Sequence, residues 1–307
     1  MTLYINLGFP KTSTTNLQEN FYPYLVGVNF IGRRSKTDKS YPKNYDQIFW
    51  NLSDFVENRL QFDDIKIEEL KNQIRKLCKN KKILISQERW LVPYQKNYNT
   101  EKFEVVSQFK NLERLEGFLK KLQIDYKYFL IKRDSITSVK SMFATLQERI
   151  EKIFGPEYLD FDEFVKKYKR KDSDYESIRL FFDIYNLEKI KKIIPDEKLK
   201  IFNFSTIVDN PRMFLKEFSN YIDVEVDEFL VKKLNSKTRV SDKIDGKYAI
   251  SKPKKFFIFL KKLVPSFIKN IVKSKINLNR DNNLFMKKDK LISIYSDEEL
   301  RKIINYD

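Results

Sequence analysis

Short apolar runs alternate with longer amphipathic stretches along the first 250 residues or so. The amphipathic stretches have the periodicity of helices, and each apolar run has the length of a buried strand. The expected strands are residues 2–7, 81–86, 126–131 and 198–204, and the expected helices begin near residue 14 and span 65–79, 112–123, 136–153, 161–168, 175–194 and 210–222. This alternation predicts an α/β fold in which helices flank both faces of a parallel central β-sheet.

The composition changes near residue 250. Residues 252–275 hold eight lysines and no acidic residue, and their apolar positions follow a helical period that Pro265 interrupts. Such a segment is typical of helices on an anionic membrane surface; the alternative is a helix docked on the domain with its lysines in water. We therefore expect a domain at residues 1–250 and a basic amphipathic helical extension at residues 251–307, ending in a short helix.

Composition limits the chemistry that the chain can perform. It has 307 residues, of which 41% are hydrophobic, so it can bury a core. It has no histidine, and its one cysteine, Cys78, excludes an intrachain disulfide and a cysteine-cluster metal site. Acid–base work must therefore fall to a carboxylate, lysine, tyrosine or cysteine, and no metal site is evident.

The net charge of +17 predicts an anionic partner, such as a nucleotide, a nucleic acid, an acidic glycan or an anionic lipid surface. The N-terminus lacks the pattern of a secretory signal, and no run of about 18 apolar residues predicts a membrane span. These features favour a cytoplasmic protein. Residues 252–275 add the hypothesis of peripheral attachment to the inner face of a membrane.

The first strand runs into the sequence "GFPKTSTT", residues 8–15, just before a helix. Such a turn places backbone N–H groups and the positive end of a helix near a bound anion. The second glycine of a nucleoside-triphosphate loop is missing, Lys11 follows Gly8 by only three residues, and no acidic residue suited to hold magnesium follows a later strand. The alternative is a threonine-capped helix after a proline turn, with Lys11 merely solvated.

The segment "GFPKTSTTNLQ" resembles the 5′-phosphosulfate-binding loop of the sulfotransferases that use 3′-phosphoadenosine 5′-phosphosulfate (PAPS). Ser13 stands where that family usually has glycine. A second segment, "FLIKRDSITSVKSMFA", resembles the family's 3′-phosphate motif, with Arg133 and Ser141 eight residues apart and Ser135 in place of the usual proline. The resemblance implies these cofactor-binding residues: Pro10, Lys11, Thr12, Ser13, Thr14, Thr15, Arg133 and Ser141.

The resemblance covers roughly residues 1–245, and its weaker parts are typical of bacterial and Golgi enzymes that act on carbohydrates. "ILISQE" is similar to their strand ending in Ser-x-Glu, whereas Phe204 and its two successors replace the acidic residue of a later strand–helix unit. The implied fold is a three-layer sandwich like that of the P-loop NTPases. The implied reaction is transfer of a sulfuryl group from PAPS to a hydroxyl, or an amine, of a carbohydrate or glycolipid acceptor.

In this reaction Lys11 would stabilise the leaving phosphate, and Glu88 is the candidate general base. The alternative for Glu88 is a salt bridge with Arg89 or a neighbouring lysine. Arg89, Trp90 and Tyr94 are candidates for the acceptor pocket, and neither a metal nor a nucleic acid partner is expected. Two other functions stay open: a P-loop kinase or nucleotide phosphotransferase, and a non-catalytic basic protein that binds a membrane surface or a nucleic acid.

Overall fold

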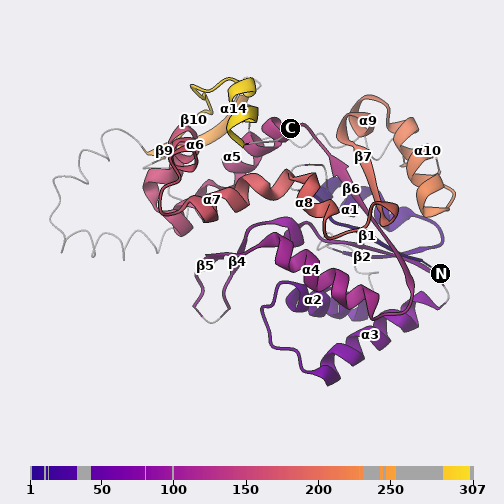
Figure 1. Cartoon of the computed structure of the whole chain (residues 1–307). Helices are drawn as coiled ribbons and strands as arrows, with labels where there is room; N and C mark the ends of the chain where they lie inside the picture. Colours follow the sequence, from indigo (N-terminus) through magenta and orange to yellow (C-terminus); the bar gives the residue numbers. More distant parts are fainter. Residues whose placement is uncertain are drawn as a thin grey trace.

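A five-stranded parallel sheet forms the centre of the computed structural model (Figure 1). The structure describes residues 2–9, 12, 14–32, 43–79, 81–98, 100–227, 229–230, 243–244, 247–253 and 286–304. In spatial order the strands are β2 (Val28–Gly32), β3 (Lys82–Ser86), β1 (Thr2–Asn6), β6 (Asp125–Lys132) and β7 (Leu199–Asn203). Because all four pairings are parallel, the carboxyl ends of the strands share one edge of the sheet.

Helices cover both faces of this sheet, since alternate strand residues enter two separate hydrophobic clusters. Leu3 and Ile85 belong to the cluster that takes in residues of α2 (Lys43–Val56), α3 (Asp64–Cys78), α4 (Gln108–Lys120) and α5 (Ser135–Phe154). Tyr4 and Phe129 face the other way, toward α1 (Thr14–Asn20) and α10 (Pro211–Ile222). The predicted α/β fold with helices on both faces is confirmed.

One predicted helix is interrupted. Residues 175–194 form α7 (Tyr175–Phe182), a 3-10 turn (Asp183–Tyr185) and α8 (Leu187–Lys191). Asn186 separates the two helices and caps the start of α8. Its extended backbone leaves the helical conformation, and its side chain accepts a hydrogen bond from the Lys189 N–H at 3.2 Å. The remaining elements of the main domain are α6 (Phe161–Arg170), α9 (Phe204–Asp209) and the hairpin of β4 (Tyr94–Lys96) and β5 (Phe103–Val105).

The C-terminal part contains strands as well as the expected short helix. β8 (Lys243–Ile244), β9 (Lys247–Pro253) and β10 (Met286–Lys290) form an antiparallel sheet, and α14 (Asp297–Ile304) follows. The first two residues of the segment 252–275 therefore end a strand rather than begin a helix. Residues 254–275 lie outside the described residues, so membrane binding by this segment and the domain division near residue 250 stay predictions.

Within the described residues, we find no helix that is long and apolar enough to cross a membrane.

Candidate active site

The loop after β1 begins at the carboxyl edge of the sheet, between β3 and β6. The Leu7 N–H donates to the carbonyl of Phe129 at 3.1 Å, which continues the β1–β6 pairing by one residue. The chain then turns at Gly8, whose φ of +48° suits glycine and whose N–H donates to Asn6 Oδ1 at 3.0 Å. The glycine of the predicted anion loop is therefore at the place where the strand ends.

Two of the loop's threonines point into the protein. The Thr12 hydroxyl donates to the carbonyl of Phe9 at 2.6 Å, the Thr14 hydroxyl reaches the same carbonyl at 3.3 Å, and both side chains are buried. A hydroxyl has one proton, so in this arrangement both groups close the turn instead of donating to a ligand. Thr15 is half-buried in the first turn of α1. Pro10, Lys11 and Ser13 lie outside the described residues, and their roles stay predictions.

Gly8→Ala is expected to lower the free energy of unfolding by about 1–2 kcal/mol, because alanine is strained at positive φ. The added Cβ would also lie 2.9 Å from Thr14 Cγ2 and 3.3 Å from Glu88 Cα, so the loop would have to shift. Urea denaturation measures the change. The matched control is Gly117→Ala in α4, where no heavy atom lies within 4 Å of the new Cβ. The control should raise the free energy of unfolding by about 0.5–1 kcal/mol. Equal stabilisation by both variants would contradict the assignment of Gly8 to a turn that requires positive φ.

A buried polar network that the sequence analysis missed lies beneath the loop. Asn6 Nδ2 donates to the hydroxyls of Tyr22 at 2.8 Å and Ser86 at 3.1 Å, and Gln18 Nε2 donates to Ser86 Oγ at 3.0 Å. These bonds connect the carboxyl ends of β1 and β3 to α1 and to the turn that follows it. The only sequence signal was a polar residue, Asn6 or Ser86, near the end of each apolar run. The network fixes the two strand ends between which the loop and Glu88 emerge.

The backbone of Glu88 lies against the loop, and the role of Glu88 as a general base stays a prediction. Glu88 begins the 3-10 turn Glu88–Leu91 directly after β3 and Gln87, and its Cα lies 3.3 Å from the position of a Cβ on Gly8. Its side chain is half-buried. Arg89 forms an ion pair with the buried carboxylate of Glu57, Nη2 to Oε2 at 3.5 Å. The structure therefore brings together the loop and Glu88.

Tyr94 lies close enough to Glu88 for the charge of that carboxylate to act on its hydroxyl. Burial raises the pKa of Tyr94, the charge of Glu88 adds to that effect, and the charges of Arg149 and Arg89 oppose it. Arg149 Nη1 donates to the Tyr94 hydroxyl at 2.8 Å, and its guanidinium lies over the Tyr94 ring, 5.2 Å from the centroid. The sequence analysis missed Arg149, although its place on the helix of Ser141, eight residues later, was a usable signal.

Trp90 does not lie at a surface that an acceptor can reach. Its side chain is 0% exposed and packs in the main hydrophobic cluster, while its carbonyl accepts a hydrogen bond from Asn111 at 3.3 Å. Both faces of the indole are therefore covered by the protein. Trp90 supports the turn that carries Glu88 and Arg89, and we remove it from the candidate acceptor-binding residues.

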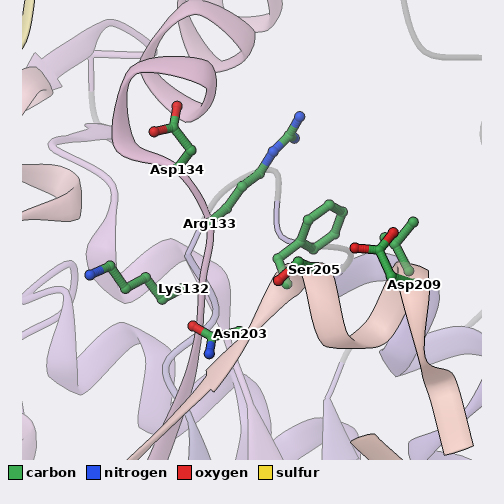
Figure 2. A pocket seen from close by; sticks show the side chains of 8 residues that line it. Lys132, Arg133, Asp134, Asn203, Ser205 and Asp209 are labelled. Carbon is green, nitrogen blue, oxygen red and sulfur yellow. The ribbon is translucent and has the colours of Figure 1, made fainter. Parts of the chain in front are cut away.

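A pocket of about 430 Å³ opens at the carboxyl ends of β6 and β7 (Figure 2). β6 continues three residues beyond Phe129, the partner of Asn6, so Arg133 projects farther out than the end of β1. The Arg133 guanidinium lies over the Phe204 ring, 5.0 Å from its centroid. The pocket is lined by Lys132, Arg133, Asp134, Asn203, Phe204, Ser205, Val208 and Asp209. Phe204, an unexplained departure in the sequence, thus supports the guanidinium expected to bind phosphate.

Ser141 lies on α5, the helix that begins two residues after Arg133. Its side chain is 8% exposed, and its carbonyl accepts a hydrogen bond from the Thr145 hydroxyl at 2.9 Å. Its place on a helix that starts at the pocket agrees with the sequence expectation, and its contact with a phosphate stays a prediction. In the described part of the chain, no three carboxylate or cysteine side chains are grouped to hold a metal ion.

Comparisons with protein-family models and with curated proteins find no match. Solved structures to which this chain is similar include sulfotransferases. The enzyme from Alicyclobacillus acidocaldarius has 13% identity over 76% of this chain and 89% of that one, with a TM-score of 0.42. Mouse sulfotransferase SULT7A1, complexed with PAP, has 13% identity over 78% of this chain and 68% of that one, with a TM-score of 0.40. Sulfotransferase STF1 from Mycobacterium tuberculosis has 9% identity over 76% of this chain and 70% of that one, with a TM-score of 0.36. All three TM-scores lie under 0.5.

Proposed function

We propose that this chain is a sulfotransferase that moves a sulfuryl group from PAPS to a hydroxyl, or an amine, of an acceptor. One observation carries the proposal: the loop at Gly8 and the pocket at Arg133 follow neighbouring strands, β1 and β6, at the same edge of the sheet. Two anion-binding motifs that lie more than 100 residues apart in the sequence therefore lie side by side. A nucleotide with phosphates at both ends of its ribose suits such a pair.

The residues of each part fit a section of PAPS. The Arg133 guanidinium can bind the 3′-phosphate through two parallel hydrogen bonds, and Ser141 adds a hydroxyl. The pocket's volume of about 430 Å³ lies in the usual range for small ligands, and the Phe204 ring and the Asn203 amide suit a nucleoside. The 5′-phosphosulfate would lie at the loop, held by Lys11 and by backbone N–H groups of residues 12 to 15.

The reaction would be an in-line displacement at sulfur. The acceptor oxygen forms a bond to sulfur while the bond from sulfur to the bridging phosphate oxygen breaks, and 3′-phosphoadenosine 5′-phosphate (PAP) leaves with both electrons of that bond. Lys11 would stabilise the negative charge that develops on the leaving oxygen. Glu88 would accept the acceptor's proton, and the closeness of its backbone to Gly8 supports this assignment because the sulfuryl group would lie at the same loop.

The acceptor would approach from the side of Glu88, Arg89 and Tyr94. We propose a carbohydrate or glycolipid hydroxyl. Arg149 and Phe181 lie on the Tyr94 ring, so Arg89, whose side chain is 38% exposed, would offer the polar contact to a sugar. Arg89 and Arg149 both carry charges that act on Tyr94. The acceptor's identity would follow from a screen of sugars against this face.

The test is an assay for PAP release from PAPS in the presence of a panel of glycans and glycolipids, with sulfated product identified by mass. We expect PAP release that depends on one acceptor class and that proceeds in EDTA. Phosphoryl transfer from ATP with magnesium would instead support a P-loop kinase. Absence of any nucleotide binding would support a basic surface-binding protein, and either result would refute the sulfotransferase proposal.

A further inference from the structure

The pocket beside Arg133 is lined by two carboxylates, which oppose binding of an anion. Asp134 lines the pocket next to Arg133, and Asp209 lines its far side. Figure 2 shows Arg133 extending over the residues of α9, whereas the Asp134 carboxylate points toward the start of α5. A full negative charge one residue from the guanidinium would repel a phosphate and weaken its binding.

Asp134 has two sets of partners. Its Oδ1 accepts hydrogen bonds from the Thr137 N–H at 2.8 Å and the Thr137 hydroxyl at 2.5 Å, so it caps the N-terminus of α5. Its Oδ2 accepts a hydrogen bond from Arg301 Nη2, on the C-terminal helix. Burial raises the pKa of Asp134, but the bonds from Thr137 and Arg301 outweigh burial and lower the pKa below its ordinary value. The carboxylate is thus charged, and a cation from a distant segment compensates it.

The helix that carries Arg301 is held firmly beside α5 (Figure 1). Ser296 and Glu299 form a reciprocal capping box, with the Ser296 N–H to Glu299 Oε2 distance at 2.8 Å. Leu300 and Ile304 are buried in the main hydrophobic cluster, and Lys140 of α5 forms an ion pair with Asp297 at 2.6 Å. The position of Arg301 therefore follows from the docking of the whole helix and does not depend on its one ion pair.

We propose that Arg301 is a positioning residue of the nucleotide site, which neutralises the Asp134 carboxylate so that the pocket at Arg133 accepts the 3′-phosphate of the nucleotide. The inference rests on the proposed function, because it takes a 3′-phosphate as the anion. Both side chains are near 40% exposed, and ion pairs of that exposure add little to stability, so the pair acts chiefly through the charge of the pocket. The C-terminal segment thereby becomes part of the nucleotide site.

The experiment is a double-mutant cycle on PAP binding, measured by calorimetry. Arg301→Ala should weaken PAP binding about threefold to tenfold, whereas Arg301→Lys, which keeps the charge, should stay close to wild type. In an Asp134→Asn background, which keeps a good helix cap, Arg301→Ala should have a clearly smaller effect, because no carboxylate is left for Arg301 to hold and compensate. Lys302→Ala is the matched control, because Lys302 pairs with Glu298 at 2.8 Å on the exposed side of α14.

The outcomes separate this inference from the proposed function. Wild-type protein that fails to bind PAP would refute the proposed function. Normal PAP binding by wild type together with undiminished binding by Arg301→Ala would overturn only the role of Arg301. Equal weakening by Arg301→Ala in both backgrounds would also overturn it, since Arg301 would then act by a route other than Asp134.

Discussion

Arg133→Ala is expected to weaken binding of PAP by about 10- to 100-fold, the range for losing a charge-assisted bidentate pair. The same change should alter binding of adenosine 5′-phosphate only slightly, because that nucleotide lacks the 3′-phosphate. Arg133 follows the last residue of β6, and its guanidinium is held over Phe204, so the group is oriented before the ligand arrives. Preorganised contacts of this kind give large differences between related ligands.

Calorimetry with both nucleotides measures this discrimination. Arg170→Ala is a suitable control, since Arg170 ends α6 with its side chain exposed. Arg133→Lys should show an intermediate loss, because a lysine keeps the charge but not the two parallel bonds. An equal loss of both nucleotides would show that Arg133 shapes the pocket in general and does not read the 3′-phosphate.

Glu88→Gln is expected to lower kcat for sulfuryl transfer about 100- to 1,000-fold, as is usual when a general base is removed. Binding of PAP should stay near wild type, because glutamine has almost the same shape and the loop contact at Gly8 involves the Cα of residue 88. The amide cannot accept the acceptor's proton, so the loss should appear in kcat and not in nucleotide binding.

The measurement is kcat with saturating PAPS and acceptor, beside calorimetric binding of PAP. Glu113→Gln, on the exposed side of α4, controls for the loss of a surface carboxylate. A variant that keeps the wild-type kcat would leave Glu88 with a structural role. A variant that loses PAP binding along with activity would assign Glu88 to the loop's shape.

Four of the five strands of the central sheet could be predicted, because each forms a short apolar run. The runs at 2–7, 81–86, 126–131 and 198–204 all became parallel strands of one sheet, whereas the edge strand β2 was not predicted. Buried parallel strands appear in the sequence as short continuous apolar runs, and stretches with the periodicity of helices separate them. The residues that follow these runs then lie at one edge, which agrees with the family resemblance that pointed to Gly8, Glu88 and Arg133.

The remaining site residues depend on tertiary contacts that no local pattern encodes. Trp90 looked like a binding residue because it follows Glu88 and Arg89, yet a 3-10 turn directs it into the core. Arg149 reaches Tyr94 only because α5 packs beside the hairpin of β4 and β5. Arg301 pairs with a residue 167 positions away, a contact that only the folded chain reveals.

The hydroxyls of Thr12 and Thr14 show a different limit. The family resemblance implied that both residues bind the cofactor, and both hydroxyls donate within the loop. The turn at Gly8 leaves the carbonyl of Phe9 in need of partners, and nearby threonines satisfy it. Whether a residue faces the ligand or the loop therefore depends on backbone geometry that the residue types do not specify.

Calorimetric titration of the wild-type protein with PAP in EDTA, beside ATP with and without magnesium, tests the sulfotransferase proposal most directly. A site built from the Gly8 loop and Arg133 predicts metal-independent binding of PAP that is at least tenfold tighter than that of ATP, given the value of one charge-assisted phosphate contact. Tighter binding of ATP that requires magnesium, or no binding of PAP, would contradict it.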